Sequence, residues 1–290
     1  MFAVEFDSVW KIYKKDFKQV TALKNITLKI PQNSIFSIIG PNGAGKTTAL
    51  KIITGITYPT KGKVKVLGGT ISDSIIKKRV GFLPENPSFF SNITPFEFLK
   101  FVLYTSEESI EEDKIISALN EVGLLKEKNE KVKKFSKGMV QRLGIAQAII
   151  HNPDLIVLDE PFSGLDPIAK EKLKEIILSF FKKGKTIILS SHNLFDVENL
   201  STHITLIKEG EIKISGKLKS LQANANYEIE FYGDIKSWGK REVKKISEKS
   251  IIILENEKEF EEFLVNVLDL KLKIVSVNLS LNNYLKRYYQ

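Results

Sequence analysis

The sequence predicts an α/β fold in which helices cover a parallel sheet, followed by a small α+β domain. Short apolar runs such as 35–39 and 155–158 have the length of strands buried on both faces. Segments with helical spacing separate these runs, and such alternation is typical of a parallel sheet. After Gly216 the chain changes to shorter, alternating stretches. We therefore expect one domain over residues 1–216 and a second over residues 217–290.

Each element of the first domain follows from its periodicity. Residues 2–7 and 25–30 alternate apolar and polar side chains, as half-buried strands do. Further strands are expected over 34–39, 62–67, 80–83, 155–158 and 186–190, and helices over 47–54 and 169–182. Between Pro95 and Ile150 apolar residues recur every three or four positions, which predicts helices. A two-strand ribbon, 203–208 and 211–215, turns at Glu209-Gly210 and closes the domain.

The second domain has the pattern of a small mixed unit. A connector over 218–226 leads into strands over 227–231, 250–254 and 272–277 and helices over 257–268 and 281–288. Its roughly 65–75 residues are close to the lower limit for independent folding.

Composition and charge exclude several classes of protein. Hydrophobic residues make up 42% and charged residues 27% of the 290 residues, which is ordinary for a globular chain and excludes a disordered one. No stretch approaches the roughly 18 apolar residues of a membrane-spanning helix. Without cysteine, no disulfide scaffold or thiolate metal site forms. The first residues lack the features of a signal peptide, so we expect the cytoplasm. The lysines behind the net charge of +9 are scattered, and we expect no nucleic-acid partner.

A glycine-rich segment fits the phosphate-loop pattern G-x-x-x-x-G-K-[ST], with a strand before it and a helix after it. Its glycines let the backbone wrap a phosphate with the N–H groups pointing inward, and the helix N-terminus adds partial positive charge. Lys46 would bind the β- and γ-phosphates, and Thr47 would offer a hydroxyl to Mg²⁺. The predicted nucleotide contacts here are Gly40, Pro41, Asn42, Gly43, Ala44, Gly45, Lys46, Thr47 and Thr48.

Two adjacent carboxylates, Asp159 and Glu160, follow the apolar run 155–158. Ligands of open α/β sheets bind at the carboxyl ends of the strands, where this pair would lie. Because adjacent carboxylates repel, we expect a cation or a proton beside them. Asp159 would hold Mg²⁺, directly or through water, and Glu160 would polarise the attacking water as general base. The alternative is an acidic pair in a solvated turn.

Together with further motifs, the phosphate loop and the acidic pair make residues 2–216 resemble the ATP-binding-cassette (ABC) ATPases. Phe135–Arg142, including Ser136 and Gly138, resembles the family's signature sequence. Ser163-Gly-Leu-Asp166 resembles the D-loop, and Ser190-Ser-His192 the switch histidine. Tyr13 has the position of the aromatic residue that stacks on adenine, and Glu85 that of the Q-loop glutamine.

The resemblance implies a P-loop NTPase core with an antiparallel β subdomain and a helical signature subdomain. It implies ATP and Mg²⁺ as cofactors and ATP hydrolysis as the activity. The catalytic residues it implies are Lys46, Glu160 and His192, and the residues near the metal are Thr47, Asp159 and Glu85. The nucleotide contacts outside the loop are Tyr13, Glu85, Ser136, Gly138 and Asp166.

The resemblance also implies partners. In this family the signature helix of one subunit covers the nucleotide bound to the other, so we expect a homodimer or a paired ATPase subunit. The chain would energise a separate transmembrane permease from the inner face of the cell membrane. The C-terminal domain resembles the accessory domain of ABC-2 exporter ATPases, especially over 275–288, which favours export. Two features depart from the family pattern: Lys137 and Met139 replace Gly and Gln of the signature, and Glu85 replaces glutamine.

Two other functions fit parts of the sequence. A soluble mechanical ATPase acting on nucleic acid or ribosomes would share the nucleotide chemistry. DNA-repair members of that kind carry a long coiled coil between the phosphate loop and the signature, whereas about 90 residues separate Lys46 from Ser136 here. A GTPase or small-molecule kinase would leave Ser136–Gly138 and His192 without a role.

Several residues have a structural alternative. We expect His151 and His203 to be structural, and Tyr13 could be a surface or core aromatic residue. Phe89-Phe90 and the stretch 96–104 fit either a contact with the permease or an amphipathic core helix. The helical spacing of four residues near the end predicts packing rather than base stacking; these are Leu281, Tyr284, Leu285 and Tyr288.

Overall fold

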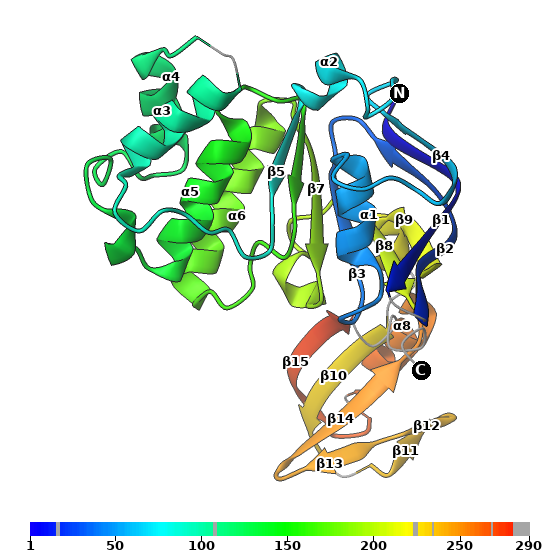
Figure 1. Cartoon of the computed structure of the whole chain (residues 1–290). Helices are drawn as coiled ribbons and strands as arrows, with labels where there is room; N and C mark the ends of the chain where they lie inside the picture. The colour runs from blue at the N-terminus through cyan, green and yellow to red at the C-terminus, as the bar shows by residue number, and fades with distance from the viewer. Residues whose placement is uncertain (16–17, 107–108, 223–225, 234, 268, 281–290) are drawn as a thin grey trace. The chain divides into compact units, whose positions relative to one another are not determined.

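The computed structural model describes residues 1–15, 18–106, 109–222, 226–233, 235–267 and 269–280 (Figure 1). The chain divides into two compact units, Met1–Ser215 and Gly216–Gln290. In the described part of the chain, no helix has the length and apolar character needed to cross a bilayer.

A six-stranded sheet forms the centre of the first unit. Its strands, in spatial order, are β5 (Val80–Leu83), β6 (Leu155–Leu158), β7 (Thr186–Ser191), β3 (Ile35–Ile39), β8 (His203–Lys208) and β9 (Glu211–Lys217). The pairs from β5 through β8 are parallel. Every residue of β3, β6 and β7 is buried, as the continuous apolar runs predict. The α/β prediction is confirmed, and the expected ribbon 203–215 is the end of this sheet, because β8 pairs with β3.

Helices cover this sheet, and the predicted helical stretch 95–150 divides into three of them. They are α3 (Pro95–Thr105), α4 (Glu112–Glu121) and α5 (Lys137–Ile149), which pack on one another. Figure 1 shows this group on the side of the sheet that also carries α6 (Pro167–Lys182). The helix α1 (Lys46–Ile53) follows the phosphate loop, and the one-turn helix α2 (Ser74–Lys77) was not predicted.

An antiparallel sheet of β1 (Phe2–Lys15), β2 (Lys18–Pro31) and β4 (Lys61–Val66) completes the unit. Its hairpin is about twice as long as the stretches 2–7 and 25–30 predict. The register of β1 and β2 shifts between Phe6 and Val9 and again between Val9 and Lys11. A bulge moves the alternation of side chains by one residue, and this hides the continuation of the strand from a pattern of period two.

The described part of the second unit contains a four-stranded antiparallel sheet and a helix that packs on it. The strands, in spatial order, are β13 (Lys244–Ile246), β14 (Lys249–Leu254), β10 (Asn226–Tyr232) and β15 (Lys273–Ser280). The helix α8 (Glu257–Asn266) packs Phe263 against Phe231 and Ile252 of the sheet. The expected connector 218–226 begins with α7 (Leu218–Gln222), and the two-residue strands β11 (Ser237–Trp238) and β12 (Arg241–Glu242) are too short to be predicted. The predicted helix 281–288 lies outside the described residues.

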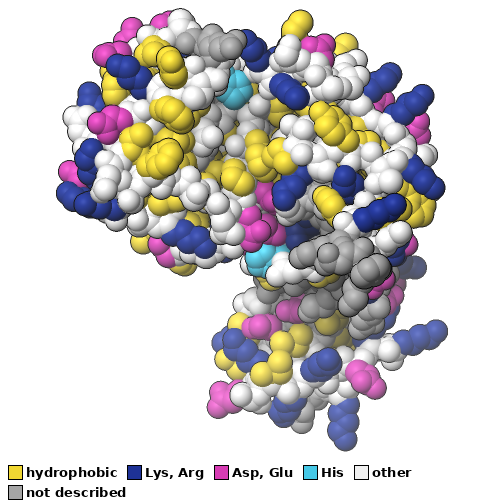
Figure 2. Space-filling view, viewed as in Figure 1, with side chains coloured by type: hydrophobic (Ala, Val, Ile, Leu, Met, Phe, Trp, Pro, Cys, Tyr) yellow, Lys and Arg dark blue, Asp and Glu magenta, His cyan; other side chains and the backbone are white. Residues whose placement is uncertain are grey.

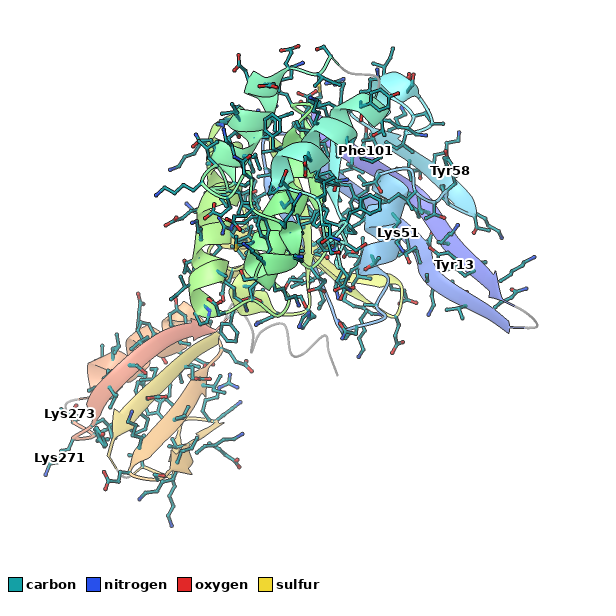
Figure 3. All side chains as sticks on the ribbon, turned by 60° about the vertical axis from the view of Figure 1, so that its left-hand side comes forward. Tyr13, Lys51, Tyr58, Phe101, Lys271 and Lys273 are labelled. Carbon is teal, nitrogen blue, oxygen red and sulfur yellow. The ribbon has the colours of Figure 1, made fainter. Side chains whose placement is uncertain are left out.

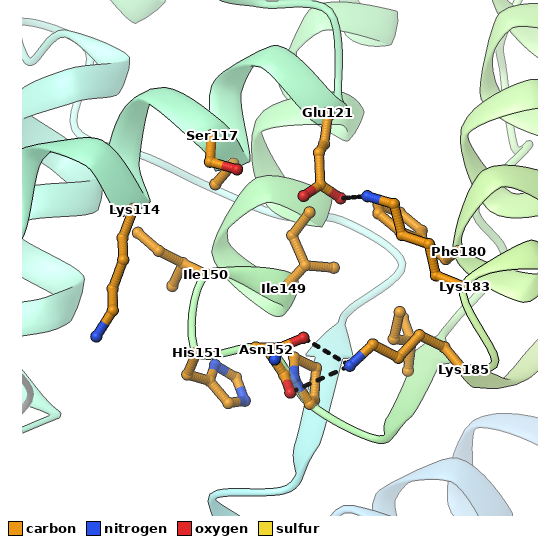
Figure 4. A pocket seen from close by; sticks show the side chains of 13 residues that line it. Lys114, Ser117, Glu121, Ile149, Ile150, His151, Asn152, Phe180, Lys183 and Lys185 are labelled. Atoms are coloured by element: carbon orange, nitrogen blue, oxygen red, sulfur yellow. Dashed lines mark hydrogen bonds and ion pairs between the residues drawn. The ribbon is translucent and has the colours of Figure 1, made fainter.

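A pocket of about 480 Å³ lies where β6 and β7 begin, between α4 and the last turns of α5 and α6 (Figure 4). Two lysines of this pocket bind side chains that line the same pocket. Lys183 pairs with Glu121 at 2.8 Å, and Lys185 donates to Asn152 Oδ1 at 2.6 Å. His151 borders the pocket, with Nε2 3.3 Å from the carbonyl oxygen of Val80. Its place at the start of β6 agrees with the structural role expected for it.

Candidate nucleotide-hydrolysis site

The predicted phosphate loop connects the end of β3 to the start of α1. Gly45 precedes the helix with φ of +108°, and Gly43 has φ of +79°, a left-handed region that glycine enters at little cost. A Cβ atom on Gly45 would overlap the carbonyl oxygen of Ala22 on β2. Glycine is therefore needed at 45 for two reasons, the conformation and the close approach of a neighbouring strand.

Lys46 lies in the first turn of α1 and is 5% exposed. Its Nζ donates hydrogen bonds to the carbonyl oxygens of Gly40 (2.8 Å) and Pro41 (3.2 Å). The same ammonium forms an ion pair with Glu160 Oε1 at 3.1 Å. A buried charge needs such compensation, and here the loop and the carboxylate provide it together.

Asp159 and Glu160 follow β6 and are both buried. Thr47 Oγ1 donates to Asp159 Oδ1 at 3.2 Å, which joins the phosphate loop to the acidic pair. Glu160 has φ of +46°, a left-handed conformation that costs a residue with a side chain about 1 kcal/mol. Such strain persists only where the surroundings hold it, and it is common at functional sites.

His192 follows β7, the strand between β6 and β3. Its Nδ1 lies 2.8 Å from Glu160 Oε2, and its backbone N–H donates to the same oxygen at 3.3 Å. The two oxygens of Glu160 therefore have different partners, Lys46 for Oε1 and His192 for Oε2. Because β6, β7 and β3 are neighbours, all these groups meet at the carboxyl edge of the sheet.

An open pocket of about 280 Å³ borders these groups. Its lining residues are Val20, Thr21, Ala22, Asn42, Gly43, Ala44, Gly45, Lys46, Thr47, Thr48, Glu85 and Glu160. Glu85 thus lies beside the loop, as its predicted position requires. The contribution of 20–22 was not predicted, since no chemical signal marks these residues and the folding of β2 alone brings them there.

Tyr13 is not among the lining residues, but it pairs across the hairpin with Val20, which is. Opposed residues of an antiparallel pair point to the same face, so Tyr13 shares a face of the hairpin with the pocket-lining residue Val20. Its ring is 38% exposed, and Lys11 Nζ lies 4.9 Å from the ring centroid. Figure 3 shows it on the hairpin.

Known proteins are similar to this chain in sequence. Residues 23–163 match the family model for ABC transporters. The lantibiotic transport ATP-binding protein SrtF of Streptococcus pyogenes is 42% identical over 199 residues, which cover 69% of this chain and 86% of SrtF. The chain belongs to the ATP-binding subunits of ABC transporters. It is therefore an ATP-binding ATPase.

Further relatives of this ABC ATPase agree. The bacitracin transport ATP-binding protein BcrA of Enterococcus faecalis is 37% identical over 201 residues, covering 68% of this chain and 65% of BcrA. The dimeric ATP-binding cassette MJ0796, solved in a post-hydrolysis state with ADP and Pi, has a TM-score of 0.68 and 28% identity, and the match covers 74% of this chain and 98% of that one. These relatives give no support to a mechanical ATPase acting on nucleic acid or ribosomes.

Three of the predicted nucleotide contacts absent from the pocket lining belong to the signature and D-loop segments of the ABC ATPase: Ser136, Gly138 and Asp166. The others are Tyr13, Gly40 and Pro41. Ser136 caps α5, and its Oγ accepts from the backbone N–H of Met139 at 3.3 Å. The helix begins at Lys137, directly after this cap, which satisfies a donor of its first turn. Asp166 caps α6 in the same way, accepting from the N–H of Ala169 at 2.9 Å.

The starts of α5 and α6 lie against each other. A Cβ atom built on Gly138 would lie 3.2 Å from the Cβ of Ala169, and one on Gly164 would overlap the side chain of Lys137. Arg142, further along α5, donates to the carbonyl oxygens of Val122 and Gly123 at 3.0 and 2.7 Å. Burial lowers the pKa of Arg142, although guanidinium remains charged in proteins. The signature and D-loop segments therefore form one surface.

Ser190 is the residue of the site that the sequence did not single out. It is fully buried in β7 and contacts both Asp159 and Glu160. The sequence contained it within Ser190-Ser-His192, where only the histidine was given a role. Its signal is its place two residues before His192, at the carboxyl end of β7, which lies next to the acidic pair that follows β6.

Proposed function

We propose that this chain hydrolyses ATP with Glu160 as general base and thereby energises a separate transmembrane permease. The observation that carries this proposal is the place of Glu160 between Lys46 of the phosphate loop and His192 of β7. A γ-phosphate would compete with Glu160 for the ammonium of Lys46, and this would release a carboxylate oxygen toward the attacking water. His192 would hold the other oxygen and so orient the base.

We infer that Thr47 and Asp159 hold Mg²⁺ together with phosphate oxygens of ATP. A hydroxyl and a carboxylate are hard oxygen donors of the kind Mg²⁺ prefers, and their oxygens lie 3.2 Å apart. Among the described residues, no three acidic or histidine side chains gather into a metal-binding group. Substrate oxygens and water would complete the coordination of the ion, as is common for Mg²⁺, and the ion would supply charge stabilisation for phosphoryl transfer. Glu85 is proposed to approach it from the pocket wall.

We further propose that two such subunits close on two ATP molecules. Ser136 and Gly138 present the N-terminus of α5, and helix N-termini favour phosphate. These residues and Asp166 do not line the chain's own pocket, and in this proposal a second subunit would bring them to the nucleotide. The solved relative MJ0796 is dimeric, which supports this arrangement. Whether the partner is an identical chain is tested below.

The permease is proposed to bind beside α3, at the inner face of the membrane. One face of α3 is core, with Phe98 and Leu99 buried and Phe89 edge-on to Phe98 at 4.8 Å. Phe90, Phe101 and Tyr104 are 68%, 49% and 71% exposed. Figure 2 shows exposed hydrophobic side chains over this unit, and Figure 3 labels Phe101. The buried face of α3 fits an amphipathic core helix, and the exposed face is the one proposed to contact the permease. Exposed aromatic side chains are frequent anchors of protein interfaces.

The cargo is proposed to be an exported amphipathic molecule of peptide character. The names of SrtF and BcrA give lantibiotic and bacitracin transport for those two proteins. The unit 216–290 is proposed to be an accessory domain of the exporter type, attached to the nucleotide-binding domain.

The decisive variant is Glu160→Gln, which keeps the shape of the side chain and removes the base. We expect it to bind ATP, to lose at least about 100-fold in turnover and to elute as a dimer only with ATP and Mg²⁺. Lys46→Ala is the control: it should lose the ATP-dependent dimer because it loses nucleotide affinity. Normal turnover in Glu160→Gln would refute the base assignment. A monomer that binds ATP tightly would refute self-pairing and indicate a different partner chain.

A further inference from the structure

Ser190 joins the two acidic residues of the site through a single hydroxyl group. Its Oγ donates to Asp159 Oδ1 at 2.6 Å and accepts from the backbone N–H of Glu160 at 2.7 Å. The side chain is fully buried in β7, so water does not replace either bond. The Ser190 hydroxyl is therefore a donor to the Asp159 carboxylate and an acceptor from the Glu160 backbone.

The two hydrogen bonds restrain the backbone of Glu160 and the carboxylate of Asp159. Glu160 has a left-handed backbone, and a bond to its N–H opposes a return to an extended conformation. Asp159 Oδ1 receives a second hydrogen bond from Thr47 of the phosphate loop. The rotation of the Asp159 carboxylate is therefore fixed from two sides, by β7 and by the loop.

We propose that Ser190 is a positioning residue for ATP hydrolysis, which sets the orientation of Asp159 and Glu160 relative to the phosphate loop. This inference rests on the proposed function, since Ser190 acts only through the metal ligand and the general base assigned there. The hydrogen bonds of the Ser190 hydroxyl go to Asp159 and Glu160, not to Lys46 or the backbone of the phosphate loop. We therefore expect Ser190 to affect turnover rather than ATP binding.

Removing the hydroxyl has a definite structural consequence. In Ser190→Ala the buried N–H of Glu160 loses its acceptor, and a donor buried without a partner is destabilising enough to favour rotation of the peptide. The Glu160 side chain would then leave its alignment between Lys46 and His192. Because the bonds from Lys46 to Gly40 and Pro41 do not involve Ser190, ATP affinity should be retained.

The test compares three variants of the full-length protein by steady-state ATPase kinetics, binding of a fluorescent ATP analogue and thermal melting. Ser190→Ala should lower kcat by about tenfold or more while KM for ATP stays within about threefold. Ser190→Thr retains the hydroxyl and should restore kcat to within about threefold of wild type. Ser37→Ala is the matched control, since Ser37 is equally buried in the adjacent strand β3 and its hydroxyl bonds to Ser201 instead.

Several outcomes would overturn the assignment. They are a kcat of Ser190→Ala close to wild type, an equal fall in Ser37→Ala, a rise in KM that matches the fall in kcat, or a folded Ser190→Thr as slow as the alanine variant. A wild-type protein that binds ATP without hydrolysing it would instead refute the proposed function, and the inference with it. A normal ATPase rate in Glu160→Gln would refute the assignment of Glu160 as general base. The effect of Ser190→Ala on kcat would still be a separate result.

Discussion

Glu160 acquires its chemistry from neighbours that are distant in the sequence. Lys46 and His192 each hold one of its oxygens, and Ser190 holds its backbone. By its residue type alone, Glu160 is one of the chain's 35 acidic residues. Its burial distinguishes it from the other described glutamates; Glu209 also has a left-handed φ, of +54°, but is exposed.

Tyr13 gives a prediction at the same scale. We expect Tyr13→Ala to weaken ATP binding by about 1–2 kcal/mol, which is the scale of stacking between an aromatic ring and a base. Tyr13→Phe keeps the ring and should bind ATP as the wild type does. Equilibrium titration with a fluorescent ATP analogue measures both. Equal ATP affinity in all three proteins would mean that Tyr13 does not stack on the base. It would then be a surface aromatic residue in contact with Lys11.

The sequence predicted most of these residues and missed others for a physical reason. Gly40–Thr48 and Asp159-Glu160 carry their chemistry in consecutive residues, so the sequence alone predicts them. Ser190 works only because β7 lies between β6 and β3, and strand order is a tertiary property. Residues 20–22 reach the pocket through the pairing of a long hairpin, which leaves no local signal.

At the scale of elements, the two helix starts carry the residues proposed to act across the dimer. Ser136 and Asp166 are N-caps, so each has a structural role whether or not ATP is bound. Substitution by alanine would therefore confuse loss of a cap with loss of function. The substituted residue therefore has to keep the helix cap while it removes the group proposed to act in function.

Asp166 allows such a separation. Asparagine caps helices as well as aspartate does, so Asp166→Asn should leave the free energy of unfolding nearly unchanged. Asp166→Ala should lose about 1 kcal/mol of it. If the carboxylate acts at the nucleotide, both variants should lose about tenfold in ATPase rate. Denaturant unfolding and ATPase assays together decide; full activity in Asp166→Asn would restrict Asp166 to capping.

Elements were predicted well where the periodicity is unbroken. The strands β3, β6 and β7 and the helix α6 lie close to their expected bounds, since burial on both faces or on one stripe sets their pattern. The hairpin was underestimated because bulges near Ser8 interrupt its alternation. The exact start of α5 is set by the hydroxyl of its cap, Ser136, rather than by hydrophobic spacing, so periodicity alone does not give it.

At the scale of the whole molecule, the two units differ in what stabilises them. The first buries a continuous apolar sheet, whereas the second has a small core assisted by ion pairs. Arg241 donates to both carboxylate oxygens of Glu259, at 3.2 and 2.9 Å, and also pairs with Glu255 at 2.7 Å. These bonds tie β12 to the start of α8.

This cluster predicts how the second unit responds to acid. The Arg241 hydrogen bonds hold the pKa of Glu259 below its ordinary value of 4.5, so Glu259 stabilises the folded unit above that pH. The stability is lost as pH falls through the lowered pKa, because the carboxylate is then protonated. In Glu259→Gln the unit should be less stable at pH 7 and depend less on pH below 4.5. Unfolding of the full chain in a Trp10→Phe background, followed by the fluorescence of Trp238, measures this, with Glu261→Gln on the same helix as control. An unchanged acid profile in Glu259→Gln would contradict the linkage.

The position of β7 in the sheet has a consequence for biosynthesis. The strands β3 and β6 are not neighbours, and β7, the last of the three to be made, lies between them. A nascent chain therefore has its phosphate loop and its acidic pair long before it can bring them together. At roughly 5–20 residues per second, about 8–30 s separate the synthesis of Gly40 from that of His192. If the proposed site is the one that hydrolyses ATP, a ribosome-bound chain that ends before β7 should not hydrolyse ATP, and activity should begin only after this strand has left the ribosome.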